Sequence, residues 1–205
     1  MTPPDAPRKR GRPARAQAGT GPGTRERILA AARAEFAGRG YDQASIRAIA
    51  RGAGVDPALV HHYFGPKEQI FAAAVEAGFA PALGAPGVLA AGGRDQVGER
   101  LTRFLLGLWE NPATREPLLA VVRSAVANET AARVFRELVA VRLMRPVAEQ
   151  LDVPDAQLRA ELAAAQLVGV FMLRYVIKVE PLASADASRV IALAAPSVQR
   201  HLTGQ

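Results

Sequence analysis

The stretch from Ser45 to Phe71, SIRAIARGAGVDPALVHHYFGPKEQIF, constrains the fold more than any other part of the chain. Apolar residues from Ile46 to Ala53 recur at the three- and four-residue spacing of one buried helical face. Ser45 stands at the N-cap position of that helix. The glycines at 52 and 54 interrupt the helix, because glycine is disfavoured inside a helix and adopts a left-handed turn without steric cost. The pattern predicts a helix of about two turns that ends in a tight turn.

A second short helix is expected from about Pro57 to Tyr63. Asp56 can accept hydrogen bonds from its free N–H groups, and proline suits a first helical position. Two helices joined in this way form either an ordinary hairpin in an all-α core or a helix-turn-helix, whose second helix can enter a DNA major groove. The flanking residues favour the helix-turn-helix, because one face offers apolar side chains and the other small or polar ones. The apolar set is Leu59, Val60 and Phe64, and the exposed set is Ala58, His61 and His62.

The segment from Thr24 to about Leu83 resembles the DNA-binding domain of the TetR family of bacterial transcriptional repressors. The resemblance is strongest in A-x-x-A-G-V at 50–55 and L-V-H-H-Y-F-G-P-K-E at 59–68. In that family a first helix braces the helix-turn-helix, the third reads the major groove, and the fourth links to a ligand-binding domain. The resemblance implies base or phosphate contacts at Asp56, Pro57, Ala58, His61 and His62. It also implies phosphate anchoring by Ser45, Arg47, Tyr63 and Lys67.

Asp56 and Pro57 depart from the family pattern, which often has Ser or Thr followed by a small or polar residue. A carboxylate near DNA phosphates favours a capping role for Asp56 over a base contact, although it could accept from a cytosine amino group.

The formal charge of +7 is concentrated at the start of the chain. Residues 1–23 carry five basic side chains against one acidic, whereas residues 24–84 carry seven against six and residues 85–205 fourteen against twelve. The first 23 residues contain almost no large apolar side chain, so we expect a disordered basic arm. Arg10 and Arg12, within R-G-R-P, resemble an AT-hook that enters a narrow minor groove. A solubilising tail is the alternative.

The remaining chain predicts helices throughout, and the expected fold is therefore all-α. Residues 24–38 are expected to form a helix capped by Thr24, residues 66–79 another, and a domain boundary falls near residue 85. The expected division is thus 1–23 arm, 24–84 helix-turn-helix domain with three helices, and 85–205 helical regulatory and dimerisation domain. Apolar stripes mark helices at about 101–109, 118–126, 135–143 (halted by Pro146), 155–179 and 184–202.

Residues 85–205 resemble the regulatory half of TetR-type repressors, which implies a small-molecule cavity and a four-helix dimer interface from the last two helices of each chain. Candidate pocket residues are Trp109, Arg123, Phe135, Met144, Phe171, Met172 and Tyr175, with plain core packing as the alternative for each. Candidate interface residues are Gln166, Gly169, Val170, Leu173, Val190, Leu193 and Ala194.

Other classes of protein find little support in the sequence. There is no cysteine, and the three histidines are an adjacent pair and His201, so no metal site, catalytic residues or cofactor is expected. No apolar run follows the basic start, and the apolar segment 162–177 is short for a bilayer and contains Gln166 and Arg174. We therefore expect a cytoplasmic homodimer that binds a double-stranded DNA operator and an unknown small-molecule effector, with no membrane partner. The alternatives are a DNA-architectural protein without ligand control and a helical enzyme fused to a DNA-binding domain.

Overall fold

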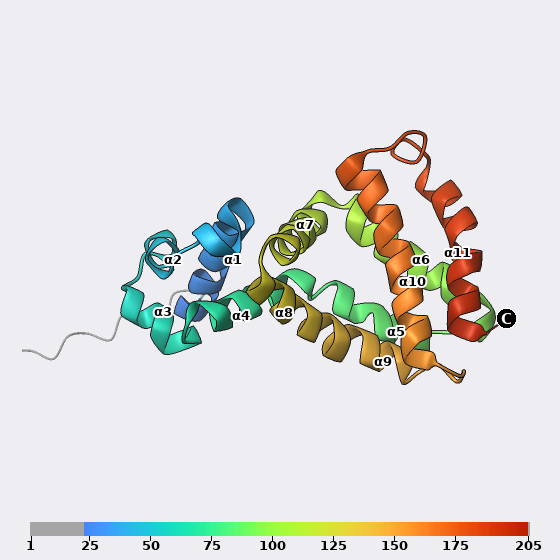
Figure 1. Ribbon diagram of the computed structural model, residues 1–205, viewed down its shortest axis with the longest axis horizontal. Coiled ribbons are helices and arrows are strands. Elements are labelled where there is room, and N and C mark those ends of the chain that lie inside the picture. Colours follow the sequence, from blue (N-terminus) through green and yellow to red (C-terminus); the bar gives the residue numbers. More distant parts are fainter. Residues whose placement is uncertain (1–22, 205) are drawn as a thin grey trace, which may run out of the picture.

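The computed structural model describes residues 23–204, which form only helices and their connections (Figure 1). Four helices make a compact head at the left of Figure 1, and the others make a larger body at its right. The head contains α1 (Thr24–Gln43), α2 (Ile46–Ala53), α3 (Pro57–Phe64) and α4 (Lys67–Phe79). The body contains η1 (Ala82–Gly84), α5 (Ala85–Ala90), η2 (Arg94–Gln96), α6 (Val97–Glu110), α7 (Pro112–Ala127), α8 (Glu129–Glu137), η3 (Leu138–Met144), α9 (Arg145–Ala148), α10 (Ala156–Phe171), η4 (Met172–Ile177) and α11 (Ala187–Thr203). The predicted all-α fold is confirmed.

The head is held by one small apolar core. Ile28 of α1, Ile49 of α2 and Val60 of α3 are completely buried, and burial of each such side chain stabilises the fold by about 1.5–3 kcal/mol. The rings of Phe36 and Phe71 meet edge to face with their centroids 4.9 Å apart. α1 packs against α2 and α4, and α3 packs against α2 and α4, so the exposed side of α3 is presented in a defined orientation.

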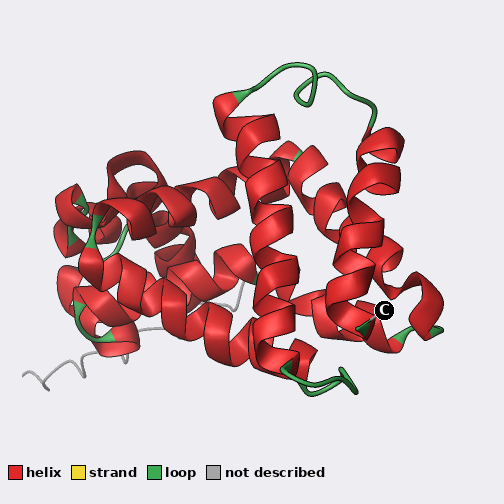
Figure 2. Cartoon of the chain, turned by 45° about the vertical axis from the view of Figure 1, so that its right-hand side comes forward, coloured by secondary structure: helices red, strands yellow, loops and turns green. Residues whose placement is uncertain are grey.

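The body is built around α6, which packs against both α10 and α11. The stretch from α8 through η3 to α9 continues as one long helical rod beneath α5 (Figure 1). A long connection over residues 178–186 joins η4 to α11 at the top of Figure 2. The last two long helices, α10 and α11, lie on the side of the body remote from the head (Figure 1).

The head meets the body where α7 and α8 pack against α1 and α4. Two ion pairs cross this junction, Arg133 to Glu68 and Arg142 to Glu76, each at 2.8 Å. The side-chain amide of Asn128 also donates to Asp42 Oδ1 at 2.7 Å. All these groups are partly exposed, so each pair contributes about 0–1 kcal/mol, and the junction is only loosely fastened by them.

Two predictions about helix ends are wrong. Thr24 does not cap α1, because Gly23 occupies the N-cap position and no side chain accepts a hydrogen bond there. Pro146 does not end its helix, because it lies in the first turn of α9, where a missing N–H is tolerated. The break predicted at residues 39–41 is confirmed, because Gly40, with φ of 71° and ψ of 177°, is not helical and kinks α1 before its last turn at Gln43.

One helix of the described residues is long and apolar enough, by length and composition, to cross a membrane. It is the continuous span Ala156–Ile177 of 22 residues, in which an 18-residue window has a mean hydropathy of 1.5 and is 28% buried in the chain. Core helices of soluble proteins meet the same criterion. A second candidate, Lys67–Phe79 with Ala82–Ala90, passes only as a pair of helices bent by 61°. The low burial of the first span leaves an apolar face without a partner in one chain.

A buried ionic network ties the end of α6 to η4. Arg174, whose side chain is 7% exposed, donates to Glu110 Oε1 at 2.9 Å and to the Leu182 carbonyl oxygen at 2.6 Å. The Tyr175 hydroxyl donates to the same Glu110 oxygen at 2.7 Å. Desolvation opposes the charge on Glu110, but the hydrogen bonds from Tyr175 and Arg174 outweigh it and lower the pKa of that carboxyl. Burial, followed by the bond to Glu110, raises the pKa of Tyr175 to about 12.

Replacing Glu110 with glutamine is expected to lower the free energy of unfolding by about 1–2 kcal/mol at neutral pH, because Arg174 loses its anionic acceptor. The figure is modest because Glu110 is 42% exposed and water screens the pair. Since the folded pKa of Glu110 lies below the ordinary 4.5, its contribution is present above that pH and is lost as pH falls through the folded value. Urea unfolding at pH 7 and at acid pH should show that the difference in the free energy of unfolding between parent and variant becomes smaller as the pH falls. The exposed Glu149→Gln is the control, and an equal loss in both variants would contradict this role.

Candidate nucleic-acid interface

The turn between α2 and α3 is fixed by local backbone bonds. Ser45 caps α2, since its Oγ accepts from the Ala48 N–H at 3.2 Å. Gly54 ends the helix with φ of 65° and ψ of 42°, a left-handed conformation that glycine adopts without penalty. The Val55 N–H then donates back to the Ala50 carbonyl at 3.0 Å. These contacts close a tight turn, after which α3 runs in a new direction and packs against α2.

The start of α3 is capped by Asp56, whose Oδ1 accepts from the Ala58 N–H at 2.8 Å. Pro57 occupies the first turn, where no N–H is needed. The carboxylate is therefore engaged with the backbone, which agrees with the capping role expected for Asp56.

The outer side of α3 is polar or small and open to solvent. Its exposed residues are Pro57, Ala58, His61, His62 and Tyr63. Only Val60 and Phe64, four residues apart, are buried. Leu59, expected in the core, is 39% exposed, because it lies about 100° around the helix from Val60. The His62 and Tyr63 rings meet edge to face at 5.3 Å on the exposed surface.

Lys67 sits half-buried at the start of α4. Its Nζ donates to the Asp42 carbonyl at 3.1 Å and lies 4.7 Å from the centre of the Tyr41 ring. An ammonium group has three donors, so these contacts fix its position and leave donor capacity for a phosphate. Burial, and next the charge of Glu68, raise the pKa of Tyr41 above its ordinary value, which keeps the ring neutral beneath the lysine.

Further arginines surround the reading helix. Arg47 and Arg51 are exposed on α2, and Arg25 in the first turn of α1 places its guanidinium 5.0 Å from the centre of the Phe64 ring. Arg25 was missed as a candidate, although its place directly after the basic arm was a usable signal. Around the exposed side of α3 the head thus offers positive charge suited to DNA phosphates.

Two family profiles match this chain in succession. Residues 28–74 match the "Bacterial regulatory proteins, tetR family" and residues 95–202 match the "Tetracyclin repressor-like, C-terminal domain". A solved TetR-family regulator of Streptomyces coelicolor A3 is 41% identical, with a TM-score of 0.70, over 90% of this chain and 99% of that one. The chain belongs to the TetR family. It is a TetR-family transcriptional regulator with a helix-turn-helix DNA-binding domain.

More distant solved structures share the fold of this TetR-family chain. A transcriptional regulator of Streptomyces coelicolor A3(2) is 22% identical with a TM-score of 0.68, covering 89% of this chain and 99% of that one. GusR of Salmonella enterica is 21% identical with a TM-score of 0.62, covering 88% of this chain and 94% of that one. No curated protein sequence matches the chain.

The candidate effector residues of this TetR-family chain do not form one site. Trp109 and Phe171 are buried and stacked, with ring centroids 5.1 Å apart, and Tyr175 also stacks on Trp109, at 6.0 Å. Phe135 instead packs on Phe79 near the head, at 5.2 Å. Met144 is buried on η3, Met172 is half-buried on η4, and Arg123 lines a cavity beside α1. The aromatic stack is a packed core contact between α6 and α10, which was the stated alternative.

The candidate dimer residues divide into two groups. Val190 and Ala194 are buried within the chain, and the Gln166 amide lies 3.5 Å from the Ala194 carbonyl, across α10 and α11 of one chain. The place of these three residues between subunits stays a prediction. Gly169, Leu173 and Leu193 are exposed, and Val170 is half-buried.

Arg10 and Arg12 of the basic arm lie outside the described residues. Among residues 23–204, no group of three or more His, Cys, Asp or Glu side chains is placed to hold a metal ion.

Proposed function

We propose that this TetR-family regulator is a repressor that binds a palindromic operator as a homodimer and is released by a small-molecule ligand. The observation that carries the proposal is the exposed face of α3, where His61 and His62 stand on a helix whose other side is fixed by Val60 and Phe64. A helix held in this way has the geometry needed to present side chains to base edges. The protein acts where chromosomal DNA lies, in the cytoplasm.

In this proposal the chain divides by task as its sequence suggested. Residues 24–84 read the operator, residues 85–205 bind the ligand and dimerise, and the arm at 1–23 adds minor-groove contacts through Arg10 and Arg12. Ser45, Arg47, Tyr63 and Lys67 contact phosphates, and Pro57, Ala58, His61 and His62 face base edges, while Asp56 caps α3. Arg25 and Arg51 join the phosphate contacts.

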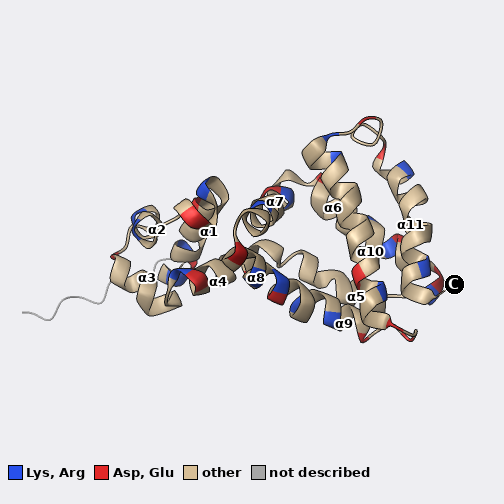
Figure 3. Cartoon of the chain, viewed as in Figure 1, with Lys and Arg blue, Asp and Glu red and all other residues tan. Residues whose placement is uncertain are grey.

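The dimer is proposed to form through the face of α10 and η4 that the chain leaves uncovered, together with the exposed Leu193 of the neighbouring α11. Inward residues recur at Ala160, Ala163, Leu167 and Phe171, whereas the exposed residues Leu162, Ala165, Gly169, Leu173 and Val176 repeat at three- and four-residue intervals on another face. No Lys, Arg, Asp or Glu occurs from Leu162 to Leu173, and the middle of α10 is accordingly tan in Figure 3. A helix that is apolar on two faces needs a second partner to cover its outer face. In the proposed dimer a symmetry-related copy covers that face.

Release by a ligand requires that the body control the position of the head. Two heads must match half-sites at a fixed helical spacing, so a small change in their separation lowers affinity. The route from body to head is the packing of α7 and α8 against α1 and α4, together with the ion pairs of Arg133 and Arg142. These surface pairs are weak enough to re-form in a second arrangement.

Variants at the proposed DNA contacts should separate into two classes. Lys67→Ala and Tyr63→Phe are expected to weaken binding to operator and random DNA alike, because phosphate contacts position a protein without reading bases. His61→Ala and His62→Ala are expected to change the base preferred at one position, at a cost of about 1–3 kcal/mol. Selection of bound sequences from a random DNA pool, followed by titration of the selected site, measures both effects.

The control is Arg145→Met, an exposed cation of α9 in the body that should alter neither affinity nor sequence preference. Identical selected motifs for the parent and both histidine variants would remove the histidines from the base-reading role. A loss of affinity for operator alone in Lys67→Ala would remove that residue from the phosphate role.

A further inference from the structure

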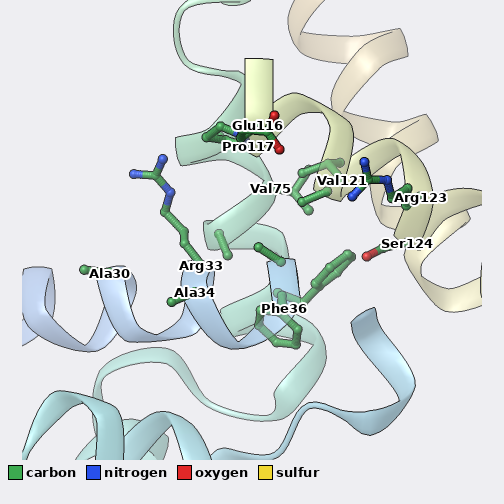
Figure 4. Close-up of a pocket in the computed structure, with 15 residues that line it drawn as sticks. Ala30, Arg33, Ala34, Phe36, Val75, Glu116, Pro117, Val121, Arg123 and Ser124 are labelled. Carbon is green, nitrogen blue, oxygen red and sulfur yellow. The ribbon is translucent and has the colours of Figure 1, made fainter. Parts of the chain in front are cut away.

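A cavity of about 380 Å³ lies between α1, α4 and α7, at the junction of head and body (Figure 4). This volume falls within the range of about 300–1,000 Å³ that is usual for small-molecule sites. The cavity is separate from the aromatic stack of Trp109, Phe171 and Tyr175, none of which lines it.

The cavity exists because its walls carry small side chains where three helices approach. Ala30, Ala34 and Ala37 recur along one side of α1, while Ala74 and Gly78 of α4 and Ala120 of α7 face the same space. Its apolar floor is made by Phe36, Phe71 and Val75, all of them buried. Larger side chains at the alanine positions would close the space, so the sequence keeps an apolar compartment open at this junction.

Two arginines from different helices border this apolar space. Figure 4 shows Arg33 on α1 and Arg123 on α7, on either side of Val75. Both side chains are exposed, and neither guanidinium has a hydrogen-bond or ion-pair partner among residues 23–204. Glu116 is the one acidic lining residue; it is exposed at the rim, and its carboxylate lies 3.8 Å from the guanidinium of Arg115. The charge of the cavity is therefore positive, and a guanidinium beside an apolar wall recognises a carboxylate well.

The cavity also continues toward the polar end of the junction. A second hollow of about 390 Å³ shares Phe36, Ala37, Ala120, Arg123 and Ser124 with the first and extends to Asp42 and Asn128. The combined space is elongated along α1 and α7, with Arg123 lining both parts.

We propose that this junction cavity, defined by its walls on α1, α4 and α7, binds a small carboxylate with an elongated apolar body. The apolar part of this ligand fills the alanine-lined space, its carboxylate is held by Arg123, and Arg33 adds positive charge at the opposite side of the cavity. Because the walls belong to the head and to the body, an occupant contacts both and stabilises one placement of the head. This proposal can be tested independently of the proposed repressor function. A protein that binds the carboxylate but no operator would support the site and contradict the repressor function.

The test is isothermal titration calorimetry of the full-length protein with decanoate as the probe and decyltrimethylammonium as its cationic counterpart. One decanoate per chain is expected to bind saturably, with no saturable binding of the cation. Ala34→Leu should abolish decanoate binding, because leucine fills the cavity from an exposed position that does not disturb the core. The double variant Arg33→Met with Arg123→Met should weaken it at least tenfold.

Matched controls are Ala113→Leu, an exposed alanine of α7 outside the cavity, and Arg145→Met, an exposed arginine of α9; both should bind decanoate as the parent does. Ala30→Leu, at another exposed position on the rim, repeats the blocking test if Ala34→Leu fails to fold. Decanoate binding that survives both alanine variants would overturn the site. Equal binding of decyltrimethylammonium, or no saturable binding of decanoate, would overturn the ligand class.

Discussion

Glutamate in place of Leu193 is expected to convert the proposed homodimer into monomers. Leu193 is 75% exposed on α11 in the single chain, an unusual position for a large apolar side chain. In the proposed interface it is covered by the partner, so the substitution would bury an unpaired carboxylate at a cost of about 3–5 kcal/mol. That cost raises the dissociation constant of the dimer by a factor of about 150 to 4,000. Sedimentation equilibrium measures the change directly.

Val126→Glu is the matched control for this experiment. Val126 is even more exposed, at 85%, but it lies near the end of α7, away from α10 and α11. The variant should remain a dimer with parental affinity. Gly169→Arg should dissociate the dimer as Leu193→Glu does, because no atom lies within 4 Å of a Cβ built at Gly169, so the arginine disturbs only a partner. Parental dimers for both Leu193→Glu and Gly169→Arg would place the interface elsewhere.

Alanine in place of Gly98 is expected to lower the free energy of unfolding by about 3 kcal/mol, near the upper end for an overpacked core. A Cβ at Gly98 would lie 2.6 Å from the Gln199 backbone nitrogen and 2.8 Å from the Ala195 carbonyl oxygen. Backbone atoms cannot rotate away, so α6 and α11 would have to separate. A hydrogen bond also stabilises this close approach of α6 to α11, because the Gly98 N–H donates to Gln199 Oε1 at 2.7 Å.

Gly107 provides the control on the same helix. No atom lies within 4 Å of its added Cβ, so Gly107→Ala should stabilise the protein by about 0.5–1 kcal/mol through helix propensity alone. Urea unfolding of both variants and the parent measures the two effects separately: Gly98→Ala reports the cost of overpacking, and Gly107→Ala reports the gain from helix propensity. A Gly98→Ala protein as stable as the parent would show that α6 and α11 do not approach as closely as the structure describes.

The head was largely predictable from sequence because its signals are local. Ser45, Gly54, Asp56 and Pro57 each determine the backbone within a few residues, and the structure finds the helix-turn-helix boundaries close to those predicted. Leu59 was misjudged because an eight-residue helix buries only one or two side chains, and apolar character alone does not say which.

The body was predictable in its helices but less so in its contacts. Pro146 looked like a stop signal, yet a helical segment accommodates it in a first turn. The pocket candidates were chosen as large or polar residues in apolar helices, and such residues pack with one another, as Trp109 and Phe171 do. The junction cavity could not be foreseen, because alanines spaced along α1, α4 and α7 reveal a space only when the three helices are brought together.

The most direct test of the proposed repressor is selection of bound sequences from random DNA by the full-length protein, followed by measurement of the mass of the complex. The predicted result is a palindromic motif with two half-sites at a fixed helical spacing, occupied by two chains. His61→Ala should then change the preferred base at the same position of both half-sites. A single asymmetric site, or binding without any sequence preference, would contradict the proposal that α3 reads a palindromic operator in a dimer.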